Sequence, residues 1–433
     1  MTVQTTPVAE ASAETLTETP EALVARLAAD GRAAQRVLAR LSDAQKAEAL
    51  RAAAAALRVA EPVILAANAQ DVAAGEAKGL TGAMLDRLRL DSARLAGIAD
   101  AVEQVAALPD PVGEVISESE RPNGLKLSRV RIPIGLIGII YESRPNVTAD
   151  AAALCLRSGN AVLLRGGSEA LHSNRAILSA MVSGLEQAGV PGAAVQLMPT
   201  QDRAVVGAML TAAGLIDMIV PRGGKSLVAR VQADARVPVL AHLDGICHTY
   251  VHASADPEMA RGIALNAKLR RTGICGSMET LLLDTQFPAS ADVVKALADE
   301  GCELRGDARA RALDPRVLPA GDEDWDTEYL DAVLSVAVVD GLDAAMDHVA
   351  AHSSHHTDAI VAADPAAAER FLAEVDSAIV MVNASSQFAD GGEFGLGAEI
   401  GIATGRLHAR GPVALEGLTT YKWLVRGTGQ ERP

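Results

Sequence analysis

The sequence predicts an α/β protein: two α/β domains with parallel-type sheets, plus a small β arm. Three observations lead to this prediction. From residue 132 onward, short apolar runs alternate with helical stretches, which is typical of parallel strands joined by crossover helices. An Ala- and Leu-rich helical pattern precedes these runs, and a hairpin pattern lies between the two. At 433 residues and 49% hydrophobic, the chain can bury enough core for two or three domains.

The first 132 residues contain three kinds of segment. Residues 1–20 have neither a basic start nor an apolar core, so we expect a disordered leader rather than a signal peptide. Residues 21–107 have helical periodicity, as in ALVARLAADGRAAQRVLARL. After them, VGEVISESE and LKLSRVRI flank a PNG turn at 122–124, which predicts a hairpin.

Two sets of apolar runs predict the strands of the two sheets. The first set consists of IPIGLIGIIY, AVLLRG, AVQLMP and DMIVPRGG. The second consists of HTYVHA, ETLLLD, LSVAVVD, DAIVAA and AIVMVN. LTTYKW then predicts a final strand, and the glycine-rich GGEFGLG before it predicts a mobile, lid-like loop.

The composition argues against several classes of partner. The 39 Lys and Arg residues against 55 Asp and Glu give a net charge of -16, which disfavours nucleic acid and anionic membrane surfaces. No uninterrupted apolar run reaches membrane-spanning length. The four cysteines contain no CxxC pair, so we expect a cytoplasmic protein without disulfides. Any anionic ligand must therefore be held by a local pocket.

The stretch NAKLRRTGICGSMET, residues 266–280, contains the candidate nucleophile, Cys275. Gly273 and Gly276 leave the sulfur accessible, and the guanidiniums of Arg270 and Arg271 are expected to lower its pKa. The functional interpretation is a thiol that forms a covalent thioester. The alternative is a small buried side chain at the start of a strand, and this stretch alone does not decide between them.

Two turns between a strand and a helix could bind an anion through backbone N–H groups. In the first, Arg165 adds a bidentate donor. The alternative is a tight βα turn without a ligand. The GKS of the second turn is not a P-loop, because Ile219 stands where that loop needs glycine, and no G-x-G-x-x-G opens a βαβ unit. The residues of the two turns are Arg165, Gly166, Gly167 and Ser168, and Gly223, Gly224, Lys225 and Ser226.

Histidine clusters raise the question of a metal, and we expect none. The three histidines of AHSSHHTD lack a carboxylate or cysteine partner at ligand spacing, which favours a surface loop or an interface. A zinc site in HLDGICH is a second alternative. The residues concerned are His352, His355 and His356, and His242, Cys247 and His248.

Taken together, the order of several long motifs resembles the family of γ-glutamyl phosphate reductases, members of the aldehyde dehydrogenase superfamily. The resemblance covers residues 21–423 and rests on IPIGLIGIIYESRPNVTADAAALCLRSGNAVLLRGGSEA, PRGGKSL, NAKLRRTGICGSMETLL, VNASSQFADGGEFGLGAEI and LHARGPVALEGLTTYKW. It implies an aldehyde dehydrogenase-like fold. It also implies NADPH-dependent reduction of L-glutamyl 5-phosphate to L-glutamate 5-semialdehyde, with release of phosphate, in proline biosynthesis.

The resemblance assigns roles to five residues of this sequence. Cys275 matches the family's nucleophile, and Asn146, in SRPN, resembles the superfamily asparagine that binds the oxyanion. Arg165 takes the place of a ribose-binding lysine. Ser168 stands where NAD enzymes carry a glutamate, so NADP is favoured. Glu328 lies where relatives hold the nicotinamide ribose, although leucine replaces the usual phenylalanine two residues later.

Charge and proximity alone make Arg270, Arg271 and Arg144 candidates for the substrate phosphate or carboxylate. The alternative is that one of them forms a structural ion pair. One departure from the superfamily is informative: where acid-forming relatives carry Glu-Leu-Gly-Gly, this chain reads HLDG at 242–245, so the general base is missing. A reductase needs no such base, since its thioester must react with hydride and not with water.

The resemblance also implies domain limits and partners. The NADP-binding domain is expected at 21–115 and 132–247, the catalytic domain at 248–399, and the arm with the C-terminal strand at 116–131 and 400–428. Exposed strand edges in such an arm predict a dimer or tetramer. Glutamate 5-kinase is a candidate partner. Two alternatives remain open, a phosphate-independent semialdehyde dehydrogenase and a catalytically silent scaffold.

Overall fold

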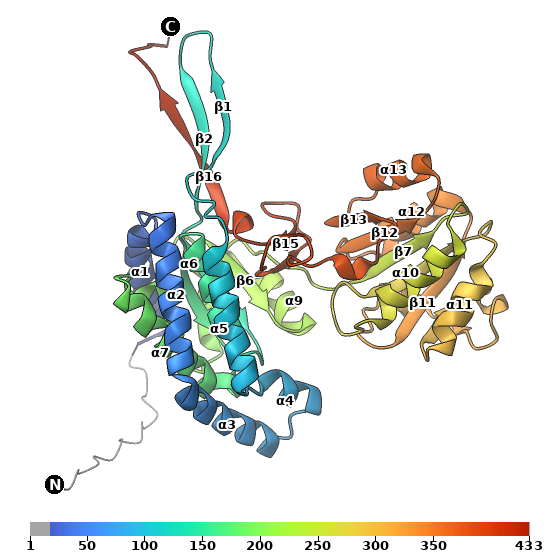
Figure 1. Ribbon diagram of the computed structural model, residues 1–433, viewed down its shortest axis with the longest axis horizontal. Coiled ribbons are helices and arrows are strands. Elements are labelled where there is room, and N and C mark those ends of the chain that lie inside the picture. Colours follow the sequence, from blue (N-terminus) through green and yellow to red (C-terminus); the bar gives the residue numbers. More distant parts are fainter. Residues whose placement is uncertain (1–17, 433) are drawn as a thin grey trace.

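A computed structural model describes residues 18–432 of the chain, arranged as two α/β lobes and a projecting arm (Figure 1). Most of the expected disordered leader lies outside the described residues. Its last residue, Pro20, is already helical, because Thr19 caps the first helix by accepting from the Ala22 N–H.

The helical layer consists of five helices, and the predicted segment 21–107 is confirmed as helical. A capping box of Ser42 and Gln45 starts the second helix, and Asp91 caps the fifth. The helices are α1 Pro20–Leu38, α2 Asp43–Val59, α3 Glu61–Ala77, α4 Gly82–Leu88 and α5 Ser92–Ala107.

The first lobe is built on a four-stranded parallel sheet of order β5-β4-β3-β6. Helices cover both faces, so the strands are almost continuously apolar. Since β4 and β6 lie on opposite sides of β3, the carboxyl ends of β3 and β6 border a topological switch point, where such sheets bind ligands. The strands are β3 Leu136–Tyr141, β4 Ala161–Arg165, β5 Val195–Leu197 and β6 Met218–Arg222, and the helices α6 Val147–Arg157, α7 Leu171–Gln187, α8 Ala204–Thr211 and α9 Lys225–Asp234.

The second lobe contains a seven-stranded parallel sheet of order β10-β9-β11-β8-β7-β12-β13. All five predicted strands are present, and the short strands β9 and β10 extend the sheet at one edge. The strands are β7 Cys247–Val251, β8 Met278–Asp284, β9 Glu303–Gly306, β10 Leu318–Pro319, β11 Val333–Val339, β12 Thr357–Val361 and β13 Ile379–Val382. The helices are α10 Pro257–Leu269, α11 Ser290–Asp299, α12 Gly341–His352 and α13 Pro365–Glu374.

The arm is a three-stranded antiparallel sheet of order β1-β2-β16. Its strands are β1 Val115–Glu120, β2 Lys126–Pro133 and β16 Thr419–Arg426.

Residues 400–418, assigned from the sequence to the arm region, instead pack into the core of the first lobe through Ile400, Val413 and Leu418. This segment carries a small sheet of β14 Gly401–Ala403 and β15 Gly411–Val413. Short 3₁₀ helices complete the chain: η1 Ser168–Ala170, η2 Gly192–Ala194, η3 Ala310–Ala312, η4 Asp322–Asp326, η5 Ser386–Phe388 and η6 Glu416–Leu418.

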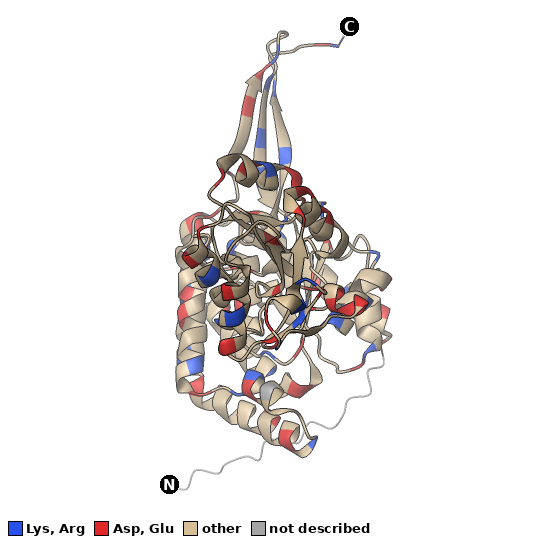
Figure 2. Cartoon of the chain, turned by 90° about the vertical axis from the view of Figure 1, so that its right-hand side faces the viewer, with Lys and Arg blue, Asp and Glu red and all other residues tan. Residues whose placement is uncertain are grey.

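Acidic and basic residues are interspersed along the ribbon in the view of Figure 2. Within residues 18–432, every helix is too short or too polar to cross a membrane.

Candidate active site

Cys275 lies in the loop between α10 and β8, at the amino edge of the seven-stranded sheet. The thiol is half-buried. Charged side chains from the carboxyl edge of the other sheet, Arg144 and Arg222, lie near enough to act electrostatically on it. The candidate site is therefore formed between the two lobes.

Donors from neighbouring elements hold the Cys275 loop in place. Ser386 donates to the Gly276 carbonyl at 2.7 Å, and Cys247 Sγ donates to the Cys275 carbonyl at 3.1 Å. The amide of Gln387 donates to two further carbonyls, at 2.9 and 3.2 Å. A Cβ at Gly245 would lie 2.2 Å from the Cys275 carbonyl oxygen, so only glycine allows this approach. The loop carbonyls are thus satisfied without regular structure.

A buried ion pair joins the two elements on either side of this loop. Lys268 of α10 lies 2.5 Å from Glu279 of β8, and both side chains are fully buried. Burial raises the pKa of Glu279 to about 7, although Lys268 acts in the opposite direction. The pair fixes both ends of the loop.

We expect Lys268→Ala to lower the free energy of unfolding by about 3–5 kcal/mol, because Glu279 then remains buried without its partner. Denaturant-induced unfolding measures this loss. The matched control is Lys295→Ala, which removes an exposed pair with Asp299 and should cost less than about 1 kcal/mol. Equal losses in the two variants would contradict the role given to the buried pair.

The expected lowering of the Cys275 pKa by Arg270 and Arg271 is wrong. Burial raises the pKa of Cys275 to about 11, and the carboxylates of Glu399 and Glu328 raise it further, while Arg222 lowers it. Nearness in sequence misled the prediction, since the Arg270 guanidinium turns away and donates to the Gln387 side chain at 3.3 Å.

Arg222 is a charged residue near the thiol that the sequence analysis did not single out. It ends β6, beside β3, and acts electrostatically on Cys275, Glu399 and Asp150. In the sequence, Arg222 could have been identified by its position just before a glycine pair at the carboxyl end of a strand. Of the predicted substrate arginines, Arg144 lies within electrostatic reach of the thiol.

Asn146, the expected oxyanion donor, lies immediately before α6. Its side-chain amide donates to Asp150 at 2.8 Å. Burial raises the pKa of Asp150 to about 6. Since an amide has two N–H groups, one remains for a further acceptor.

The structure brings two imidazoles to Cys275, in a combination that the sequence motifs did not suggest. One ligand atom each from His242, Cys275 and His356 lie within 4.8 Å of one another. Burial lowers the pKa of both imidazoles, that of His356 to about 3. His242, which the sequence places where acid-forming relatives carry the general base, is thus one of the two imidazoles beside Cys275.

The first predicted anion turn, at the end of β4, has some features that fit a phosphate. Arg165 Nε is buried without a partner among residues 18–432, and the cations Arg203 and Arg230 act electrostatically on this guanidinium. The glycines have a simpler explanation, since a Cβ at Gly166 would lie 2.2 Å from the Asn174 amide. Ser168 is exposed.

The second turn, at the end of β6, is less available to an anion, because two of its donors are already paired. The Gly224 N–H already donates to the Glu142 carboxylate at 3.1 Å, and Lys225 pairs with Asp244 at 3.0 Å. Glu328 lies beside the Gly245 amide, near the thiol. An anion at Gly224 would therefore have to displace Glu142.

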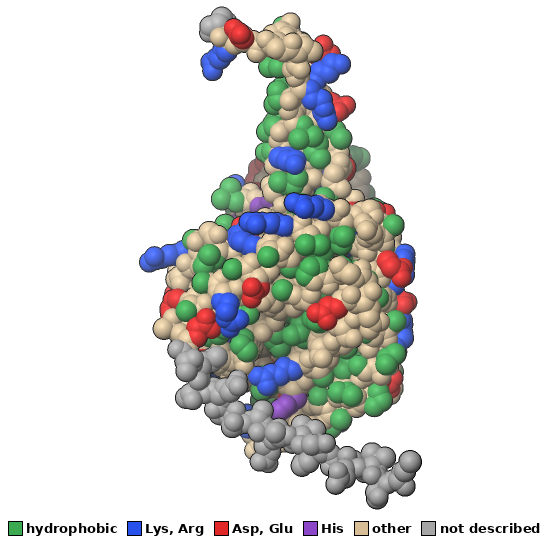
Figure 3. All heavy atoms as spheres, turned by 90° about the vertical axis from the view of Figure 1, so that its left-hand side faces the viewer, with side chains coloured by type: hydrophobic (Ala, Val, Ile, Leu, Met, Phe, Trp, Pro, Cys, Tyr) green, Lys and Arg blue, Asp and Glu red, His purple; other side chains and the backbone are tan. Residues whose placement is uncertain are grey.

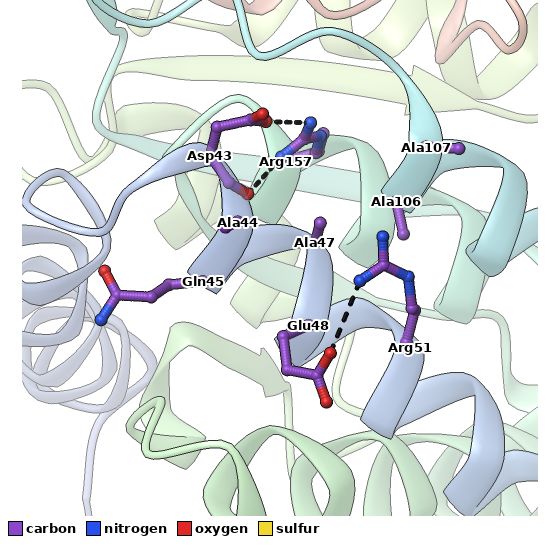
Figure 4. Close-up of a pocket in the computed structure, with 9 residues that line it drawn as sticks. All are labelled: Asp43, Ala44, Gln45, Ala47, Glu48, Arg51, Ala106, Ala107 and Arg157. Carbon is purple, nitrogen blue, oxygen red and sulfur yellow. Dashed lines mark hydrogen bonds and ion pairs between the residues drawn. The ribbon is translucent and has the colours of Figure 1, made fainter.

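A pocket on the helical layer lies apart from this site (Figure 4). It is lined by residues of α2, α5 and α6, and its charged groups pair with each other, Arg157 with Asp43 and Arg51 with Glu48. The pocket therefore adds nothing to the chemistry at Cys275.

Comparisons with known proteins agree on the family. A model of the Aldehyde dehydrogenase family matches residues 2–317. The chain is 75% identical over 419 residues to a protein named gamma-glutamyl phosphate reductase from Novosphingobium aromaticivorans, covering 97% of this chain and 99% of that protein. A relative of the same name from Rhizorhabdus wittichii is 68% identical, with coverages of 95% and 96%.

Solved structures give the same result. The crystal structure of gamma-glutamyl phosphate reductase from Thermotoga maritima has a TM-score of 0.92 at 42% identity, covering 95% of this chain and 100% of that chain. An acetylating aldehyde dehydrogenase from Geobacillus thermoglucosidasius, at 17% identity and a TM-score of 0.69 over 96% and 98% of the two chains, shares the fold. The chain belongs to the γ-glutamyl phosphate reductase family of the aldehyde dehydrogenase superfamily.

Proposed function

We propose that this protein reduces L-glutamyl 5-phosphate to L-glutamate 5-semialdehyde with NADPH, releasing phosphate, in proline biosynthesis. The names of its relatives support the reaction. The observation that carries the proposal is the half-buried Cys275 thiol between the lobes, with Arg222 and Arg144 near it. A thiol nucleophile beside cations suits an acyl group that bears a phosphate.

In the proposed reaction, the Cys275 sulfur bonds to the δ-carbonyl carbon and the bond from that carbon to the phosphate oxygen breaks. Asn146 and the Cys275 N–H would donate to the oxyanion. Phosphate takes the electron pair of the broken bond, and a thioester remains. NADPH, when bound, would supply hydride to the thioester carbon. Breaking of the C–S bond would then free the aldehyde and restore the Cys275 thiolate.

For the cofactor, the buried orphan atom Arg165 Nε supports binding of a 2′-phosphate, with the cations Arg203 and Arg230 near it and the carboxylates Glu169 and Glu142 opposing them. Glu328 would hold the nicotinamide ribose. The proposed cofactor set also includes Gly166, Gly167 and Ser168 of the first turn, and Gly223, Gly224, Lys225 and Ser226 of the second. For the substrate, Arg144 joins Arg270 and Arg271.

We expect Ser168→Glu to raise the KM for NADPH by about tenfold or more, because a carboxylate would repel the 2′-phosphate. The KM for NADH should not rise. Initial rates with each cofactor measure the change. The matched control is Ser183→Glu, which adds the same charge at an exposed position of α7. Equal effects on both cofactors would contradict the place given to Ser168.

The alternative function is phosphate-independent oxidation of a semialdehyde, and one observation favours it. His242 lies close enough to Cys275 to activate a water molecule. The reverse reaction distinguishes the two functions: glutamate 5-semialdehyde and NADP are mixed with and without inorganic phosphate, and NADPH absorbance is followed. Phosphate-dependent reduction of NADP supports the reductase, and reduction without phosphate supports the alternative. No reduction in either case favours the scaffold.

We also propose that the arm joins two copies of the chain. Alternate residues of β16, Tyr421, Trp423 and Val425, are 49%, 55% and 58% exposed and so share one face. Figure 3 shows hydrophobic side chains along the arm, next to basic ones. Within the described residues, β1 and β16 are each paired on one side only, and such edges favour further pairing. The cytoplasmic location and a glutamate 5-kinase partner stay predictions.

Replacing Tyr421 and Trp423 together by glutamate should convert the oligomer to a 44.7 kDa monomer, because the apolar face would carry two charges. Sedimentation measures the mass. The matched control is Leu407→Glu, at a side chain that is 91% exposed outside the arm strands. A parent that sediments as a monomer, or a control that dissociates equally, would contradict this interface.

A further inference from the structure

The cluster of His242, Cys275 and His356 has the composition of a metal site, and the proposed reaction uses only its sulfur. Its three ligand atoms come from the connection before β7, the loop before β8 and the segment before β12, and they lie within 4.8 Å of one another. We infer that this cluster binds a Zn²⁺ ion, which holds the Cys275 sulfur and reversibly inhibits the protein. Binding of the ion does not depend on which substrate the enzyme uses.

The orientation of His242 is that of a metal ligand. Its Nδ1 is 2.7 Å from the Ile402 carbonyl, which can only accept, so Nδ1 carries the proton. The lone pair is then on Nε2. Histidines that bind metals usually donate their other N–H to a carbonyl or carboxylate, which fixes the tautomer in this way.

His356 provides an independent observation. Its side chain is fully buried, and Nε2 has no hydrogen-bond partner within residues 18–432, whereas Nδ1 lies 2.9 Å from the Thr357 hydroxyl. A buried polar atom without a partner is uncommon and costly. The imidazole of His356 packs edge to face on that of His242, with ring centroids 5.0 Å apart. An ion between them would give Nε2 its missing partner.

The ligand types select the ion. Two imidazoles and one thiolate suit Zn²⁺, whereas Mg²⁺ and Ca²⁺ prefer oxygen ligands. Zinc bonds of about 2.0–2.1 Å to nitrogen and about 2.3 Å to sulfur place the ligand atoms of a tetrahedral site about 3.3–3.6 Å apart. Separations of up to 4.8 Å must therefore contract by at most about 1.5 Å, which rotation of the side chains can supply.

Carboxylates lie within electrostatic reach of the proposed ion. Glu399 and Glu328 act on the Cys275 sulfur as negative charges and would attract a dication, while Arg222 and Arg144 act on it as positive charges. When Zn²⁺ binds, a Zn–S bond replaces the S–H bond and the thiol proton goes to solvent, with no change of oxidation state. Water fills the fourth position. The sulfur lone pair that would attack the substrate is then bound to the ion, so turnover stops until a chelator removes it.

Zn²⁺ binding is measured on the full chain without turnover, by competition with a coloured chelator of known affinity. The metal-free parent is expected to take up one ion per chain. His242→Asn and Cys275→Ser should each weaken binding by about 100-fold or more, since loss of even an outer partner of a ligand costs about 10–100-fold. The matched controls, His408→Asn and Cys302→Ser, remove a surface imidazole and a buried thiol elsewhere and should bind like the parent.

Alkylation of Cys275 by iodoacetamide, read by mass spectrometry, gives a second result. Stoichiometric Zn²⁺ should slow the labelling by about tenfold or more, and a chelator should restore it. The inference is overturned if the parent binds no ion, if binding survives in both ligand variants, or if the bound ion leaves labelling unchanged. If Cys247→Ser lost binding and Cys275→Ser did not, the ion would be bound by Cys247 on the other side of His356. That result would also refute the inference.

Discussion

Replacing Cys275 by alanine is expected to lower the rate of NADP reduction by more than about 1,000-fold, in the reverse reaction with glutamate 5-semialdehyde and phosphate. The effect should be this large because the sulfur forms the covalent intermediate, and no neighbouring group can take its place. The other cysteines of the chain are buried, and among them Cys247 donates its proton to the loop carbonyl of Cys275 itself. The rate is measured from NADPH absorbance.

The matched control for this experiment is Cys302→Ala. It removes a thiol from the same lobe that lies in the hydrophobic core and not in the site. We expect this variant to react within about threefold of the parent, since its effect is on packing alone. If Cys275→Ala kept a tenth or more of the parent rate, the covalent mechanism would be wrong. If both variants lost activity alike, the loss would reflect misfolding, which the unfolding midpoint of each variant would reveal.

The sheets could be predicted from sequence because both are parallel and covered on both faces. Each central strand is therefore a continuous apolar run, and the predicted strands all appear. The edge strands β9 and β10 were missed because they are ELRG and LP, too short and too polar to show such a pattern. Residues 400–418 were misplaced because their few apolar residues show no periodicity that would assign them to the first core.

The residues of the site could be predicted only where they belong to a short sequence motif that can be recognised by itself. Cys275 with its flanking glycines is such a motif, and so are the two turns. The pairing of His242 with His356 is different, since 114 positions in the numbering separate them and they meet because β7 lies between β8 and β12. The order of strands in a sheet is a tertiary property that no local pattern records.

Arg222 provides the last test, because the structure and the sequence assign the cation of the site to different residues. Arg222→Gln should lower turnover by about 100-fold, the usual cost of losing one preorganised charge or donor at a reacting centre. It should also slow alkylation of Cys275 at pH 8, because loss of the cation raises the pKa of the thiol and leaves less thiolate at any pH below it.

The matched control is Arg270→Gln. This guanidinium donates to the Gln387 side chain and is not among the charges that act most strongly on the Cys275 thiol, so alkylation should proceed close to the parent rate. The opposite result, with Arg270→Gln slowing alkylation and Arg222→Gln leaving it unchanged, would restore the assignment made from sequence. Because Glu399, Glu328 and Arg144 remain in both variants, the comparison isolates the contribution of Arg222. Arg222 then acts by keeping enough of the thiolate available in a pocket whose burial and carboxylates both favour the thiol.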